Sequence, residues 1–209
     1  MSRSRLISII KIVVFVGALL PLAWLVWKAV HNDLGANPVE FVTHASGDTA
    51  LIFLLSSLAI TPLRKLAKFP DLIRFRRMLG LYAFFYASLH LLTFAGLDHH
   101  FNWAEIVPDV YKRPFVTAGF SAWLLMVPLA LTSTTWSIRK LGGKNWQRLH
   151  WLVYLSAIAA VVHYWWLVKK DIREPLKYAV ILAVLLGFRV VKSLMESKAR
   201  PAAGVSSAG

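Results

Sequence analysis

The feature that most constrains this chain is an apolar run of about twenty residues, 149–168 (LHWLVYLSAIAAVVHYWWLV), with a histidine near each end. A run of this length can cross a bilayer as a helix. An ionisable side chain inside such a span is costly, and it is a hypothesis for a functional site by default. We therefore ask what His150 and His163 hold.

The chain as a whole has the pattern of an integral membrane protein. Hydrophobic residues make up 57% of its 209 residues and charged residues only 16%, and the charges cluster between the apolar runs. This clustering is typical of segments whose solvent is lipid. We expect an all-α membrane protein, a six-transmembrane helical bundle. The expected spans are about 6–27, 50–63, 78–97, 115–131, 149–168 and 175–191, the second beginning earlier, among residues 43–49.

The chain is expected to form one domain, residues 1–197, followed by a disordered tail, 198–209. The basic, apolar N-terminus resembles a signal peptide, but its apolar run continues past twenty residues without a cleavage site, so we expect a retained first helix.

The net charge of +14 does not indicate a nucleic-acid partner, because no soluble domain carries a basic stripe. The absence of cysteine excludes thiolate-bound iron–sulfur clusters and catalytic thiols.

Positive charge predicts the orientation of the bundle. If the N-terminus is inside, 17 of the 24 Lys and Arg residues fall in inside segments, as the positive-inside rule requires. Both termini are therefore expected in the cytoplasm. The longest outer connection, 98–114, could dock a partner, or it could be an interfacial loop anchored by Trp103 and Tyr111.

Two histidines are expected to reach the same depth on different helices. His90 is about twelve residues into the third span and His163 about fourteen into the fifth, and both spans run in the same direction. Two neutral imidazoles at matched depth are suited to binding a haem iron from opposite faces. The alternative is a pair of core histidines bonded to backbone carbonyls or to nearby hydroxyl groups.

The third candidate histidine, His150, lies thirteen residues before His163, which on an ideal helix leaves the two rings about 140° apart. Either a bulge near residues 156–160 absorbs this difference, or His150 serves a separate site at the cytoplasmic edge. Arg76 and Arg77 are expected at the same depth, with Arg148 nearby. Guanidinium groups there are suited to haem propionates or a flavin phosphate, or they could be simple positive-inside anchors.

The other histidines are expected to be solvated at the outer side: His31 and His44 at span ends, and His99 and His100 in the outer loop. Asp48 and Glu174 are likewise expected near span ends. No acidic residue is therefore expected deep in the membrane.

The segments RFRRMLGLYAFFYASLH (74–90) and NWQRLHWLVYLSAIAAVVHYWW (145–166) resemble the MsrQ (formerly YedZ) family. This family comprises the haem-binding membrane subunits of bacterial methionine-sulfoxide reductase systems. More distantly, the chain is similar to the ferric reductase and NADPH oxidase transmembrane domain. The resemblance covers nearly the whole chain, and it implies that the haem ligands fall on His90, His150 and His163.

The resemblance further implies a multi-pass b-type cytochrome of the bacterial inner membrane. It would carry electrons from the respiratory quinol pool to a periplasmic molybdopterin-containing partner, with haem b and FMN as cofactors. The catalytic site would then lie on the partner, in a heterodimer that repairs oxidised periplasmic proteins. The chain has Arg76 near the place of a fourth histidine, and it carries no NADPH domain. Two alternatives stay open: a b cytochrome that reduces a metal or another small substrate, and a transporter with a histidine proton relay.

Overall fold

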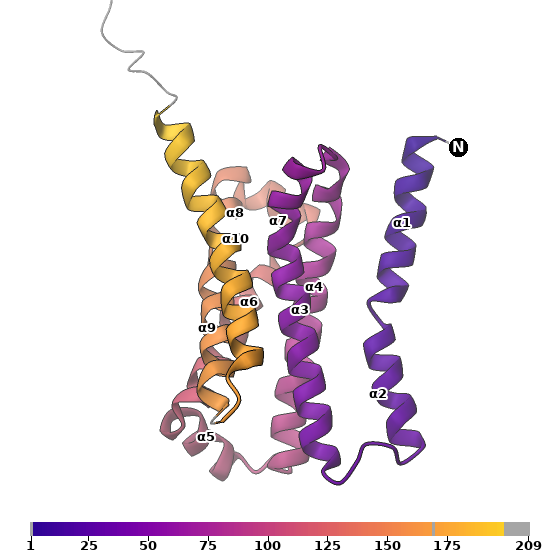
Figure 1. Ribbon diagram of the computed structural model, residues 1–209, viewed down its shortest axis with the longest axis vertical. Coiled ribbons are helices and arrows are strands. Elements are labelled where there is room, and N and C mark those ends of the chain that lie inside the picture. Colours follow the sequence, from indigo (N-terminus) through magenta and orange to yellow (C-terminus); the bar gives the residue numbers. More distant parts are fainter. Residues whose placement is uncertain (1, 169, 199–209) are drawn as a thin grey trace, which may run out of the picture.

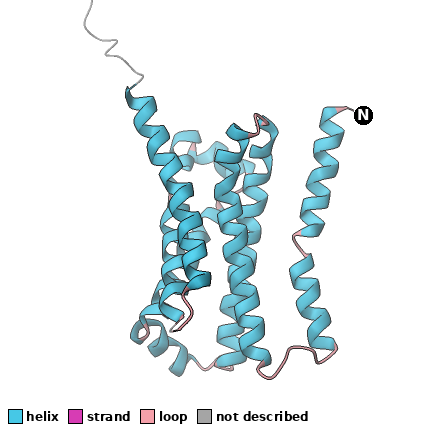
Figure 2. Cartoon of the chain, in the orientation of Figure 1, coloured by secondary structure: helices cyan, strands magenta, loops and turns pink. Residues whose placement is uncertain are grey.

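In the computed structural model, which describes residues 2–168 and 170–198, the chain is a bundle of helices joined by short connections (Figures 1 and 2). No strand occurs among these residues. The tail expected to be disordered lies outside the described residues, apart from Lys198 at its start. The helices are α1 (Arg3–Gly17), α2 (Leu20–Val30), α3 (Pro38–Leu66), η1 (Pro70–Leu72), α4 (Ile73–Thr93), η2 (Phe94–Asp98), α5 (Trp103–Lys112), α6 (Pro114–Leu131), α7 (Thr135–Leu141), α8 (Gly143–Leu149), α9 (Leu152–Leu167) and α10 (Arg173–Lys198).

Five helical segments of the described chain are long and apolar enough to cross a membrane. They are Arg3–Val30, Pro38–Leu66, Pro70–Asp98, Pro114–Leu131 and Arg173–Ser197. The fifth expected span, 149–168, is interrupted, because α8 ends at Leu149 and α9 begins only at Leu152. The 16 residues of α9 rise about 24 Å, which is less than the roughly 30 Å of a bilayer core.

The helices pack as two antiparallel pairs with flanking elements. α3 lies along α4 and α6 along α9, while α10 packs beside α9 and α3 and the α1–α2 segment lies on the outside of the bundle (Figure 1). Leu58, Ala83 and Ala157 are fully buried where the pairs meet. Large apolar side chains on α1 and α10, such as Ile12 and Val184, are instead exposed, as expected for lipid-facing surfaces.

The two ends of the bundle differ in composition. The described chain ends, the α3–α4 connection, α7 and α8 lie at one end, and α5 lies at the opposite end together with the α2–α3 and α9–α10 connections (Figure 1). We call the first the basic end and the second the α5 end. The basic end carries Arg64, Lys65, Lys68, Arg74, Arg76, Arg77, Arg139, Lys140, Lys144 and Arg148.

The second span begins earlier than expected. α3 starts at Pro38, where the Asn37 side chain caps the helix by accepting a hydrogen bond from the Glu40 amide at 3.3 Å. The expected start among residues 43–49 is wrong, and the helix runs through Pro62 past the expected end at residue 63 to Leu66. As a result, Asp48 lies about ten residues inside α3, at the level of Glu174 and Lys177 in the first turns of α10.

Pro62 leaves a carbonyl without a helical partner, and α10 supplies one. A proline has no N–H to donate to the residue four before it, which here is Leu58. The Arg189 guanidinium donates to the Leu58 carbonyl and also to the Leu185 carbonyl of its own helix. The same guanidinium lies over the Tyr154 ring at 5.4 Å. Arg189 thus links α10 to α3 and α9 instead of serving only as a membrane anchor.

The first span, expected as one helix, is divided at residues 18–19 into α1 and α2. The hydroxyl group of fully buried Tyr86 donates to the Ala18 carbonyl at 2.7 Å and accepts from the Leu22 amide at 3.2 Å. It therefore replaces a direct i→i−4 hydrogen bond of the backbone, a recognised cause of helix kinks. Pro21, which also lacks an N–H, adds to the break.

The connection 98–114 contains the helix α5. Ile106 is buried, whereas Trp103, Val107 and Tyr111, spaced by four residues, are exposed. The aromatic residues of this expected interfacial loop are thus carried on an ordered amphipathic helix.

Candidate functional site

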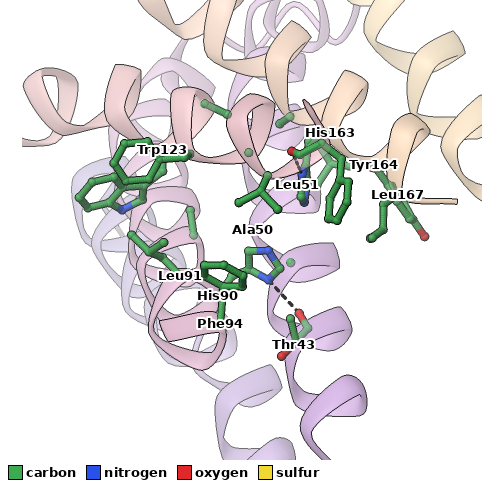
Figure 3. Close-up of a pocket in the computed structure, with 18 of the residues that line it drawn as sticks. Thr43, Ala50, Leu51, His90, Leu91, Phe94, Trp123, His163, Tyr164 and Leu167 are labelled. Carbon is green, nitrogen blue, oxygen red and sulfur yellow. Dashed lines mark hydrogen bonds between the residues drawn. The ribbon is translucent and has the colours of Figure 1, made fainter. Parts of the chain in front are cut away.

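His90 on α4 and His163 on α9 face each other across the interior of the bundle (Figure 3). Their ring centroids are 6.0 Å apart and their planes are inclined by 74°. Each ring is fixed by one backbone carbonyl: His90 Nδ1 lies 2.9 Å from the Thr43 carbonyl on α3, and His163 Nδ1 lies 2.6 Å from the Phe115 carbonyl on α6. Two antiparallel helix pairs therefore each orient one histidine.

These hydrogen bonds fix the tautomer of both rings. A carbonyl only accepts, so Nδ1 carries the proton in each imidazole and Nε2 has the free lone pair. A metal-binding histidine commonly donates its other N–H to a carbonyl in this way. Two Nε2 atoms each bound about 2 Å from one metal ion would set the ring centres roughly 6 Å apart. The donor set and the spacing of the rings thus fit a haem iron bound from both faces.

A glycine makes room for each histidine. Gly47 follows Thr43 by one helical turn, and Gly119 follows Phe115 by one turn. A Cβ atom on Gly47 would lie 3.0 Å from His90 Nδ1, and one on Gly119 would lie 2.7 Å from His163 Nδ1. The same local arrangement, a carbonyl acceptor with glycine four residues later, thus recurs on α3 and α6.

The two rings line a cavity of about 610 Å³, within the range of small-molecule and cofactor sites. We call it the histidine cavity. Its deeper wall is largely apolar, with Leu51, Ala83, Trp123 and Met126; Leu51 and Trp123 are labelled in Figure 3. Towards the α5 end the wall becomes polar. The polar residues there are Asn37, Glu40, His44, Asp98, His99 and Arg113.

His150 occupies a different place. It caps the end of α8 at the basic end, stacked on Trp146 with 3.8 Å between ring centroids. Its Nε2 lies 3.2 Å from the Thr132 hydroxyl on the segment after α6. The helix is interrupted at residues 150–151, and residues 156–160 are regular α-helix. The bulge considered near residues 156–160 is therefore absent, and His150 is separate from the histidine cavity.

The three candidate arginines also lie at the basic end. Arg76 and Arg77 are on α4 close enough to His150 to act on its charge, and Arg77 donates to the Ser133 carbonyl at 3.4 Å. Arg148 is exposed on α8. The structure thus brings these arginines into the region of His150.

Sequence reasoning missed Gly47 and Gly119, and it gave Asp48 no functional role. The glycines could not be found from the sequence, because their role depends on which helices pair. Asp48 could have been found: Asn37, Pro38 and Glu40 together form a helix-start signal, with a capping residue, proline at N1 and an acid in the first turn. That signal would have put Asp48 about ten residues inside the helix.

Comparison with known proteins gives one family match and many close relatives. Residues 45–161, more than half of the chain, match the family model described as the ferric reductase-like transmembrane component. This match contains His90 and His150 but ends two residues before His163. No solved structure matches the chain.

The relatives share about half of their residues with this chain. A protein of Herminiimonas arsenicoxydans is 49% identical over 96% of this chain and 93% of its own length. A protein of Xanthomonas euvesicatoria is 54% identical over 88% of this chain and 87% of its own length. A protein of Rhodospirillum rubrum is 50% identical over 90% of each. All three carry the name of MsrQ, the haem-binding subunit of a protein-methionine-sulfoxide reductase.

Proposed function

This chain belongs to the MsrQ family, within the ferric reductase-like transmembrane components, and we propose that it is a b-type cytochrome whose haem iron is bound by His90 and His163. Membership makes it the haem-binding subunit of a methionine-sulfoxide reductase. The observation that carries the ligand assignment is the pair of facing imidazoles, each with Nδ1 on a backbone carbonyl and Nε2 left free.

Each part of the cavity has a role in holding the cofactor. Haem, when bound, supplies a one-electron redox centre. The Thr43 and Phe115 carbonyls hold the two imidazoles in one tautomer and raise their basicity as ligands. The apolar wall excludes water and favours a buried macrocycle. On the polar wall towards the α5 end, Arg113 is suited to the propionate groups.

We infer that the subunit carries electrons from membrane quinol to a periplasmic, molybdopterin-containing reductase partner in a heterodimer. The reduction of methionine sulfoxide would take place on that partner. The exposed aromatic face of α5 is a candidate for contact with it, as is the rim of the histidine cavity at the same end.

The subunit is proposed to cross the bacterial inner membrane six times, with both termini in the cytoplasm. The path of the chain supports six crossings: α6 runs to the basic end and α10 starts from the α5 end, so α9 must cross between them. The concentration of Lys and Arg at the basic end supports its cytoplasmic position.

A second cofactor site is proposed at the basic end, around His150, Arg76, Arg77 and Arg148. It would bind the acidic groups of a further haem or the phosphate of FMN, since guanidinium groups bind both in bidentate fashion. FMN titration followed by fluorescence tests this idea. Double replacement of Arg76 and Arg77 with Gln should weaken binding at least tenfold, whereas Arg173→Gln at the α5 end should leave it unchanged.

The absorption spectrum of the purified protein tests the main proposal. The wild type should show the Soret and α bands of a b-type cytochrome, and His90→Ala and His163→Ala should each remove or shift them. His31→Ala, at the exposed end of α2, is the matched control and should leave them intact. A colourless wild-type protein, or bands unaffected by both cavity substitutions, would reject the assignment.

A further inference from the structure

Three titratable residues follow one face of α3 from the α5 end into the histidine cavity. Glu40, His44 and Asp48 are spaced by four residues, so they lie one above the other on the helix. All three line the cavity. Their exposure falls along the series: the side chain of Glu40 is 62% exposed, that of His44 is 43% exposed, and Asp48 is partly buried.

Neighbouring members of the series are within reach of one another. His44 Nε2 lies 3.9 Å from Glu40 Oε1, and His44 is close enough to Asp48 to act on its charge. Side chains four residues apart on a helix have Cβ atoms about 6 Å apart, a gap that one bridging water can close. We call these three residues the α3 ladder.

Asp48 has titratable neighbours of both charges on two other helices. The Tyr164 hydroxyl on α9 lies beside it, and Glu174, Lys177 and Tyr178 face it from α10. Lys177 is bound to Glu174 at 2.6 Å, so this amine is shared with a second carboxylate. A partly buried carboxylate that lines the histidine cavity is costly to ionise and marks a candidate functional site.

We propose that the α3 ladder conducts protons between the α5 end and Asp48, and that Asp48 binds one proton each time the haem iron gains one electron. This proposal rests on the proposed haem in the histidine cavity. The electron comes from the quinol donor and the proton from water at the α5 end. Protonation of one Asp48 carboxylate oxygen cancels the negative charge that the electron brings. When the electron leaves for the partner, the proton returns along the ladder.

Electrostatic attraction and repulsion couple the oxidation state of the haem to the protonation of Asp48. Charges in a low-dielectric site interact strongly over short distances. A ferric centre therefore favours the ionised form of Asp48, and a ferrous centre favours the protonated form. The ladder gives that proton a route which avoids the apolar wall of the cavity.

A redox titration of the haem-loaded protein at several pH values tests whether Asp48 binds a proton when the haem is reduced. In the wild type the midpoint potential should fall as pH rises, by up to about 59 mV for each tenfold change in proton activity. Asp48→Asn should retain haem but lose most of this slope. Asp171→Asn, an exposed acid in the α9–α10 connection, is the matched control and should keep it.

The rate of proton uptake tests the ladder itself. Rapid reduction of the protein with a pH indicator in solution should show one proton taken up per haem in the wild type. His44→Gln should keep the slope of midpoint potential against pH but slow proton uptake at least tenfold, because the α3 ladder loses the imidazole between Glu40 and Asp48.

The outcomes separate this proposal from the one it rests on. A wild-type protein without haem would reject the proposed function itself. A haem-loaded Asp48→Asn variant with the wild-type slope would overturn the role of Asp48. If that variant does not bind haem, His44→Gln decides: uptake at the wild-type rate would overturn the ladder.

Discussion

Gly119→Ala is the substitution that most sharply probes how the histidine cavity is built. The new methyl group would lie 2.7 Å from His163 Nδ1 and 2.9 Å from Cε1, whereas ordinary contact begins at 3.4 Å. The ring would have to move by about 0.7 Å, the difference between 3.4 and 2.7 Å. That movement stretches and weakens the hydrogen bond to the Phe115 carbonyl, which is 2.6 Å long, and it turns Nε2 away from the position proposed for the iron.

The expected loss of haem affinity follows from the weakened hydrogen bond between His163 and the Phe115 carbonyl. Removing the group that orients a metal-binding histidine typically costs 10–100-fold in metal affinity, or about 1.4–2.7 kcal/mol. Gly47→Ala should have a smaller effect, because its methyl group would be 3.0 Å from His90 Nδ1 and needs a shift of only about 0.4 Å. We therefore expect Gly119→Ala to weaken haem binding more than Gly47→Ala.

Haem titration into the haem-free protein, followed at the Soret band, measures this effect. Gly80→Ala on α4 and Gly187→Ala on α10 are matched controls, since a Cβ atom at either position meets nothing within 4 Å. Both should bind haem like the wild type and gain up to about 1 kcal/mol of helix stability. Equal haem affinity in Gly119→Ala and Gly80→Ala would refute the steric argument.

Three further predictions concern the surrounding bundle. Arg189→Met should destabilise the protein by about 1–3 kcal/mol, because it leaves the Leu58 carbonyl unpaired. Pro62→Ala should recover part of this loss by restoring the N–H that bonds to this carbonyl. Thermal unfolding of the two single variants and the double variant measures the coupling between the two sites, and strictly additive effects would contradict it. Tyr86→Phe should lower the free energy of unfolding by a similar amount and loosen the junction of α1 and α2, which faster amide hydrogen exchange around residues 18–22 would show. Exchange at the wild-type rate there would contradict the proposed bridge by the Tyr86 hydroxyl. His150→Ala should leave the absorption bands and potential of the haem in the histidine cavity unchanged, and loss of those bands would show that the two sites are not separate.

Much of the fold could be predicted because lipid imposes a simple rule. Apolar runs long enough to span a bilayer must be helices. This rule located α6 to within one residue and also found α4 and α10, although α4 begins five residues before its expected start and α10 ends seven residues after its expected end. The errors have local causes. The polar start of α3 hid its first two turns, and the interruption at residues 150–151 divided a continuous apolar run.

The candidate site was predictable in its side chains but not in its backbone. His90 and His163 could be paired from depth alone, because an imidazole inside an apolar span is conspicuous. The groups that orient them are main-chain carbonyls of Thr43 and Phe115, which any residue could supply. Gly119 has meaning only once α6 is known to lie against α9, and a single sequence does not contain that pairing.

The most direct test of the central claim is the low-temperature electron paramagnetic resonance spectrum of the oxidised protein. Two axial imidazoles held near the observed 74° between ring planes should give a low-spin ferric signal with strong anisotropy, and His163→Ala should convert it to a high-spin signal. A high-spin signal in the wild type, or a low-spin signal that survives replacement of both His90 and His163, would contradict the account.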